Sequence, residues 1–175
     1  IYATFVLEWE LILVGVFGIL SAISAAFFSW IGGFADRKYG PKPIIVLAVL
    51  TLIGVCIVIL NMTPTQIFGV QLEDGSLLPT QIFFVCGGVI GAAGGILQAS
   101  SRSMMVRHSD PARPTEAFGL YALSGKATAF LAPMLIAFAT QITGSARLGV
   151  SPLVVLFVIA LVLLLWVHPK GENRK

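Results

Sequence analysis

A single lysine, Lys126, lies inside an otherwise apolar stretch that reads GLYALSGKATAFLAP over residues 119–133. It comes about ten residues after Glu116, so a helical rise of about 1.5 Å per residue places it roughly 15 Å from that polar end. A charge at that depth in a membrane costs at least about 2.5–3.5 kcal/mol and marks a candidate functional site. An ammonium there offers binding of an anion or a carboxylate, so we predict that Lys126 contacts a substrate or its gate.

The surroundings of Lys126 leave its partner open. Small side chains dominate its helical face, which indicates a packed interior or a cavity rather than lipid. No Asp or Glu falls within the body of the apolar runs, so the counter-charge has to be a bound anion, backbone carbonyls or a part of the protein outside this chain. If the counter-charge lies in a part of the protein outside this chain, the role of Lys126 is structural. The residues on its face are Gly119, Ala122, Ala129 and Pro133, with Phe130 as the bulky exception.

Further polar side chains belong to the same hypothesis. We predict that Tyr121, Ser124 and Gln98 contribute to the substrate site or gate, although Ser124 falls on the opposite side of the helix from Lys126. Arg102 and Glu116 lie at the ends of apolar runs, where we predict a cytoplasmic gate. For Arg102 two roles stay open: anchoring to lipid headgroups, or pairing across the closed gate.

No enzymatic chemistry is visible in the sequence. It has no nucleophile–base pair, no phosphate-binding loop and no cluster of residues spaced as metal ligands, so we expect neither an enzyme nor a cofactor or metal, and no nucleic-acid partner. Cys56 and Cys86 both fall in apolar runs, which favours packing over a disulfide.

The composition predicts a membrane protein. The chain is 57% hydrophobic and 11% charged, whereas soluble proteins carry about 25% charged residues. A membrane-spanning helix needs roughly 20 mostly apolar residues, and five runs qualify. Residues 1–7 look like the end of a sixth, and the chain begins within it, so we expect a piece of a longer protein. The five predicted spans are about 11–33, 43–62, 81–101, 117–140 and 149–167.

Basic residues predict the orientation in the bilayer. The five predicted spans place the connecting segments alternately on the two sides of the membrane. Of the eleven Lys and Arg residues, all but Lys126 and Arg147 then lie on the same side. The positive-inside rule makes that side, and with it the C-terminus, cytoplasmic. The residues on that side are Arg37, Lys38, Lys42, Arg102, Arg107, Arg113, Lys170, Arg174 and Lys175.

Glycines recur at four-residue spacing in the third span. Gly87, Gly91 and Gly95 therefore share one helical face, where small residues let two helices approach closely. We predict helix packing at this face, and a sliding or gating helix is the alternative.

The first basic segment, GGFADRKYGPKP over residues 32–43, resembles the signature loop G-x-x-x-D-R-x-G-R-[RK] of the major facilitator superfamily. Two residues separate Arg37 from the next glycine where the pattern has one, which leaves open whether Arg37 or Lys38 takes the role of the arginine. The resemblance implies a conformational latch loop in which Asp36 bridges to a neighbouring helix end and holds the cytoplasmic gate shut. The matching residues are Gly32, Asp36, Arg37, Gly40 and Lys42.

A longer segment, residues 98–135, resembles the vacuole-effluxer branch of that superfamily, the autophagy-related amino-acid exporter-like permeases. It matches a Q-x-x-S-R-S segment followed by [EA]-x-F-G-x-Y-x-x-S-G-K. The resemblance implies an all-α membrane fold in which this chain is the C-terminal half of twelve helices, with five complete spans and the stub of a sixth. The matching residues are Gln98, Ser101, Arg102, Ser103, Glu116, Phe118, Gly119, Tyr121, Ser124, Gly125 and Lys126.

These observations predict a secondary transporter that moves a small polar solute by alternating access, with amino acids as a candidate class. Its partners would be the missing N-terminal half, the solute and the lipid bilayer, and we expect a bacterial inner membrane rather than a vacuolar one. The alternatives are a drug or sugar facilitator of the same superfamily and a membrane scaffold subunit that does not transport.

Overall fold

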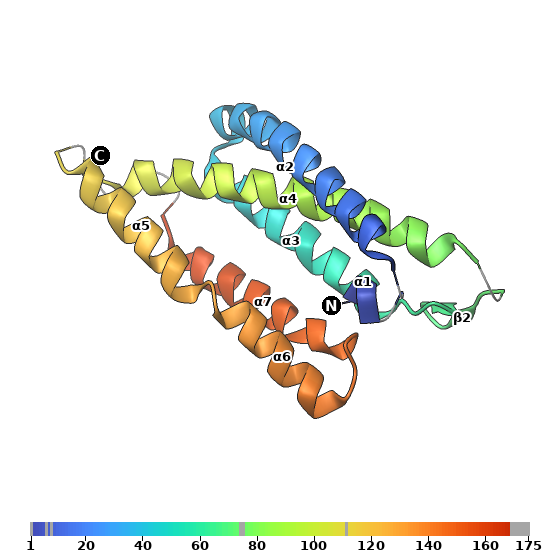
Figure 1. Ribbon diagram of the computed structural model, residues 1–175. Helices are drawn as coiled ribbons and strands as arrows, with labels where there is room; N and C mark the ends of the chain where they lie inside the picture. Colours follow the sequence, from blue (N-terminus) through green and yellow to red (C-terminus); the bar gives the residue numbers. More distant parts are fainter. Residues whose placement is uncertain (1, 6, 8, 74–75, 111, 169–175) are drawn as a thin grey trace.

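The computed structural model describes residues 2–5, 7, 9–73, 76–110 and 112–168 of the chain. Figure 1 shows a bundle of long helices in which α4 runs through the middle and α5 and α6 follow each other along one edge, beside α7. The elements are α1 (Tyr2–Phe5), α2 (Leu11–Tyr39), α3 (Pro41–Leu60), β1 (Gln66–Ile67), β2 (Val70–Gln71), α4 (Leu78–His108), α5 (Pro114–Thr128), α6 (Leu131–Thr143), the 3₁₀-helix η1 (Leu148–Val150) and α7 (Ser151–Trp166).

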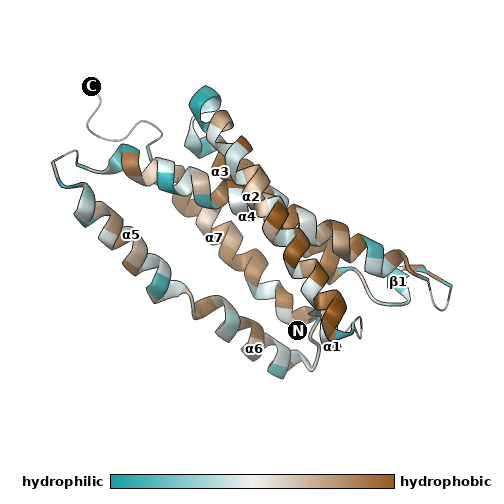
Figure 2. Ribbon diagram, turned by 45° about the horizontal axis from the view of Figure 1, so that its top comes forward, coloured by the Kyte–Doolittle hydropathy of each residue, from teal (hydrophilic) through white to brown (hydrophobic). Residues whose placement is uncertain are grey.

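Five helical segments of the described chain are long and apolar enough to cross a membrane, with α5 and α6 counted together and η1 counted with α7. The prediction of an all-α membrane fold with five spans is therefore confirmed, and α1 corresponds to the predicted stub. Apolar residues run along the length of α2, α3 and α7, while polar residues gather toward the ends of the helices (Figure 2). This is the distribution that a hydrocarbon core bounded by two aqueous surfaces requires.

The first long helix extends further than the sequence suggested. We expected a span ending near residue 33 and a loop over 32–43, but α2 continues to Tyr39 and α3 begins at Pro41. The turn between them is Gly40 alone, with φ 84° and ψ 160°, a conformation open essentially to glycine. Pro41 suits the first turn of the next helix because its missing N–H has no helical partner there. The predicted loop is thus wrong, because nothing before Gly40 stops the helix.

The fourth span is broken where we expected one continuous helix over 117–140. α5 ends at Thr128 and α6 begins at Leu131. Pro133 explains the break: it has no N–H for the carbonyl of Ala129, and its ring crowds that carbonyl. The N–H of Ala129 bonds instead to the carbonyl of Lys126 at 3.3 Å, which closes α5 directly after the lysine.

Asp110, Pro111 and Pro114 in the sequence predict a helix break between the third and fourth spans. α4 ends at His108 and α5 starts at Pro114, so Asp110 and Pro114 lie where the helix breaks, whereas Pro111 lies outside the described residues. On the opposite side, the loop expected over 63–80 contains a small hairpin. β1 and β2 pair antiparallel around Phe68 and Gly69, and both residues have the positive φ that a tight hairpin turn favours.

The closest packing lies among α2, α3 and α4. Trp9, just before α2, stacks on Phe84 with ring centroids 4.7 Å apart and meets Phe83 edge-on at 5.3 Å. Its indole N–H donates to Thr80 Oγ1 at 3.4 Å. A second cluster joins Ile45 and Val49 of α3 to Met104 of α4, with α7 packed against it. The first cluster joins α2, α3 and α4 at one end of the bundle, and the second joins α3, α4 and α7 toward the other end.

Candidate functional site

The glycine face of α4 lies directly against α2. A Cβ added at Gly91 would collide with the carbonyl oxygen of Ser21, one added at Gly95 with that of Ala25, and one added at Gly87 with the ring of Phe17. The two backbones therefore touch at Gly91 and Gly95, and Gly87 leaves room for the Phe17 ring. This is the small-residue mode of helix association in membranes. Ser21 Oγ also donates to the carbonyl of Gly87 at 2.8 Å, so a hydrogen bond joins the two spans.

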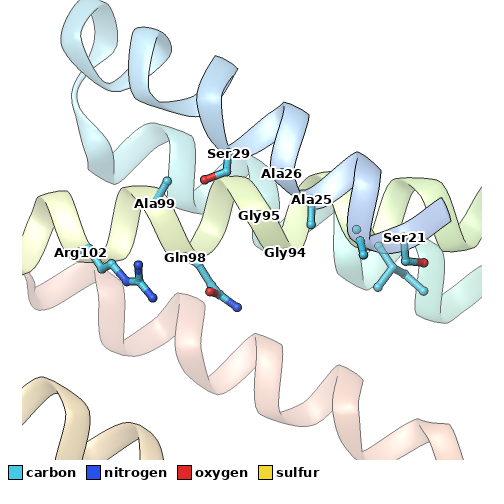
Figure 3. Close-up of a pocket in the computed structure, with 12 residues that line it drawn as sticks. Ser21, Ala25, Ala26, Ser29, Gly94, Gly95, Gln98, Ala99 and Arg102 are labelled. Atoms are coloured by element: carbon cyan, nitrogen blue, oxygen red, sulfur yellow. The ribbon is translucent and has the colours of Figure 1, made fainter. Parts of the chain in front are cut away.

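A groove with a volume of about 480 Å³ runs along this helix pair. Small side chains and glycines form most of its wall, and its polar groups are the hydroxyls of Ser21 and Ser29, the amide of Gln98 and the guanidinium of Arg102. Gln98 and Arg102 extend from the same side of α4 (Figure 3). The lining residues are Ser21, Ala22, Ala25, Ala26, Ser29, Ile90, Gly91, Gly94, Gly95, Gln98, Ala99 and Arg102.

The electrostatics of this groove favour an anionic group. Among the described residues that line it, Arg102 is the one charged residue and none is a carboxylate. Within the described chain the guanidinium of Arg102 has no ion-pair partner, because Glu116 lies beside Arg113 instead, at 3.7 Å. A guanidinium presents planar donors that fit a carboxylate or phosphate. The groove can therefore hold a small polar solute with an acidic group, using Gln98 as a further donor or acceptor.

Two of the predicted site residues of the fourth span, Tyr121 and Ser124, lie in a different place. The hydroxyl of Tyr121 is 2.9 Å from Ser101 Oγ, which ties α5 to α4. Tyr121 and Ser124 line a second cleft of about 480 Å³ with Met105 and His108. The structure thus brings Gln98 and Arg102 together in the first groove and Tyr121 and Ser124 together in the second cleft, but it does not unite the two pairs.

Lys126 is exposed in the last turn of α5. Its side chain has no hydrogen-bond or ion-pair partner in the described part of the chain. The small residues that share its face are exposed as well, and neither α5 nor α6 contains a buried residue. The face that carries Lys126 is therefore uncovered in this chain.

Asp36 contacts the body of α4, not a helix end. It is 5% exposed, Ser100 is fully buried, and Ser100 Oγ donates to Asp36 Oδ1 at 2.8 Å. This corrects two expectations, because Asp36 lies inside a spanning helix and its partner is a hydroxyl in another one. Ser100 was not among the predicted site residues, because its partner lies 64 positions away in the sequence. In the structure Gly32 packs on Ile96, and one four-residue step along each helix leads from that contact to Asp36 and Ser100.

The basic residues of the predicted latch segment make contacts of different kinds. Lys42 Nζ donates to the carbonyls of Val167 at 2.7 Å and Leu165 at 3.2 Å, so it satisfies the C-terminal end of α7. Arg37 lies over the ring of Phe34, with its guanidinium carbon 5.9 Å from the centroid, and Lys38 Nζ is 5.1 Å from the ring centroid of Tyr39. Among the described residues, neither Arg37 nor Lys38 forms an ion pair with Asp36.

Five helical segments long and apolar enough to cross a membrane, two of which pack through glycines beside a polar groove, define an integral, multi-pass membrane protein. The chain belongs to the family described as vacuole effluxer Atg22 like, whose model matches residues 2–174. It is also similar to the uncharacterized MFS-type transporter YxiO of Bacillus subtilis (strain 168), with 27% identity over 148 residues. That match covers 85% of this chain and 31% of YxiO, so the chain spans about a third of the relative's length. No solved structure matches the chain. The expected membership of this branch of the major facilitator superfamily is confirmed.

Proposed function

We propose that this chain is the C-terminal half of a secondary transporter that moves a small polar solute by alternating access. The observation that carries the proposal is the groove between α2 and α4, where Gln98 and Arg102 project from a wall of small residues. In transporters built from repeated halves, the solute binds near the middle of the membrane between the halves. The groove would then form one wall of that site, and the missing N-terminal half would form the other.

The chemistry of the groove supports a solute with a carboxylate, and amino acids are the candidate class. Arg102 would bind the carboxylate, and Gln98 with the hydroxyl of Ser29 would bind the remaining polar groups. Lys126, Tyr121 and Ser124 would act on the other side of the cavity or at its gate. Because α5 ends at Thr128, close after Lys126, the lysine lies near a break in its helix. Discontinuous helices are common at transporter binding sites.

Asp36 would act as a latch in this proposal. Its bond to Ser100 holds the end of α2 against α4, and a movement of either helix during alternating access has to break it. The membrane would be a bacterial inner membrane, with the C-terminus in the cytoplasm, as the basic segments predict. No enzymatic step forms part of the proposal.

The test uses the full-length transporter reconstituted in liposomes, with counterflow measured for amino acids, small organic anions, sugars and cationic drugs. We expect uptake of a carboxylate-bearing class and its loss in Arg102→Ala. Arg107→Ala is the matched control because it removes the same charge from α4 outside the groove. The same assay is applied to Lys126→Gln and Lys126→Ala after normal membrane insertion has been checked. Loss of transport in both variants would place Lys126 at the site or its gate, whereas normal transport would mean that its role is structural.

Two results would contradict the proposal. Transport of sugars or drugs alone, unaffected by Arg102→Ala, would favour a facilitator of another kind. Absence of any transport by a correctly inserted full-length protein would favour the scaffold alternative, which the small-residue faces also suit.

A further inference from the structure

A second groove lies on the other side of the α2–α4 pair, where α3 also packs on α4. It has a volume of about 430 Å³, and its walls come from α2 and α3 with α4 as the floor. Small residues in all three helices create the space. The lining residues are Phe28, Ile31, Gly32, Ala35, Ile44, Leu47, Ala48, Thr51, Val89, Ala92, Ala93 and Ile96.

The lining of this groove excludes a polar solute. Thr51 has the one polar side chain among the described residues that line the groove, and its hydroxyl already donates to the carbonyl of Leu47 at 2.9 Å. A polar ligand would lose its hydrogen bonds with water and gain none, which costs several kcal/mol. The groove is therefore suited to hydrocarbon, and its volume lies within the range of about 300–1,000 Å³ of small-molecule pockets.

A basic and an aromatic residue lie at one end of the groove. Lys38 comes seven residues after Ile31, which is about two helical turns, so it continues the face of α2 that lines the groove. Tyr39 follows Ala35 by about one turn and is also exposed. The Lys38 ammonium lies over the Tyr39 ring. Arg37 comes nine residues after Phe28, about two and a half turns, and so points to the opposite side of α2.

We propose that this groove binds one acyl chain of an anionic phospholipid whose headgroup phosphate contacts Lys38 and Tyr39. A lysine at the end of an apolar helix face is placed to meet headgroups, and tyrosine is enriched at the same depth of a membrane. The anionic charge distinguishes this lipid from the neutral bulk, because each basic residue near a membrane surface contributes attraction to anionic lipid. The site is distinct from the solute groove, which opens on the other side of α2.

The experiment measures lipid retained by the full-length transporter. The protein is reconstituted with equal amounts of phosphatidylglycerol and phosphatidylcholine, extracted gently, and its bound lipids are counted by native mass spectrometry. We expect retained phosphatidylglycerol in the parent protein, and a fall of about fivefold in its ratio to phosphatidylcholine in Lys38→Gln, the effect of one basic residue near the surface. Ala35→Phe, which fills the groove, should remove the retained lipid. Unfolding temperatures of the variants check that each is folded.

Arg37→Gln is the matched control, because it removes a neighbouring charge on the opposite side of α2 and should leave the ratio unchanged. A ratio that falls equally in both charge variants would overturn the proposal in favour of general surface charge. Retention that persists in a folded Ala35→Phe variant would overturn it as well, since the acyl chain would then lie elsewhere. Inorganic phosphate that binds to the parent protein and is lost in Lys38→Gln, with no phosphatidylglycerol retained, would overturn the proposal in favour of free phosphate.

Discussion

The α2–α4 pair and the α5–α6 span represent opposite solutions to packing in a membrane. The pair brings two backbones into contact through glycines and bonds them at both ends, by Ser21 to Gly87 and by Ser100 to Asp36. The α5–α6 span has no buried residue and is held to α4 by the Tyr121–Ser101 contact. Lipid supplies no hydrophobic force between helices, so association depends on close packing and hydrogen bonds. The difference indicates that α2 and α4 are packed more tightly than the α5–α6 span, whose exposed face has room for a further partner.

The largest expected effect comes from breaking the glycine contact. Gly91→Leu should lower the free energy of unfolding by about 3 kcal/mol, because its side chain has to push against the backbone of Ser21 and not against a flexible group. Gly94→Ala is the control, since an added Cβ there meets nothing within 4 Å. Denaturant titration of the purified full-length protein gives both values. Equal stability of the two variants would mean that the helices are not in contact.

The next largest effect is expected from removing the buried hydrogen bond between Ser100 and Asp36. Asp36→Ala leaves the hydroxyl of Ser100 buried without its acceptor and should cost about 1–3 kcal/mol. Asp36→Asn keeps an acceptor oxygen and should cost less. The same titration, with Ser100→Ala and the double variant, gives the coupling energy between the two residues. A coupling near zero would contradict the bond.

The turn between α2 and α3 should show a smaller effect. Gly40→Ala forces a side chain into a backbone conformation with φ 84° and should cost about 1–3 kcal/mol, near the lower end because an added Cβ there meets no neighbour. Gly33→Ala, inside α2 with open space around it, should be neutral or slightly stabilising. If the two variants unfold at the same denaturant concentration, the turn has a different conformation.

Removing the cap of α7 should have a modest effect. Lys42→Met keeps the apolar stem but frees the carbonyls of Leu165 and Val167, at a cost of about 0.3–1 kcal/mol. Hydrogen exchange should rise in the last turn of α7 and stay unchanged in α2. Exchange that rises equally in both helices would argue for a general loss of stability instead of a local cap.

The smallest effect within the chain is expected in the α5–α6 span, and it tests whether this span is packed less tightly than the α2–α4 pair. Leu120 is 68% exposed, so Leu120→Ala in the 175-residue chain should change the free energy of unfolding by less than about 0.5 kcal/mol. A clearly larger loss in the full-length protein would mean that a part of the protein outside this chain covers this face. A large loss already in the isolated chain would contradict the distinction between the two regions.

Much of the architecture was predictable because it depends on length and hydropathy. Five runs of about 20 apolar residues can only be helices in a bilayer, since every backbone group has to be satisfied within the segment. The end of α4 near Asp110 and the start of α5 at Pro114 followed from local breakers. The end of α2 did not, because the charged residues 36–38 resembled a loop although their backbone remains compatible with a helix up to Gly40.

The sequence by itself determined the membrane class, the number of spans and the family, because composition, run length and motif spacing are local properties of the chain. Only the tertiary structure decided which side chains meet. Ser100 bonds to Asp36 across 64 positions and Lys42 reaches α7 across more than a hundred, and no local pattern records such distances. The separation of Gln98 and Arg102 from Tyr121 and Ser124 has the same origin, since the faces that helices turn toward each other depend on how all of them pack.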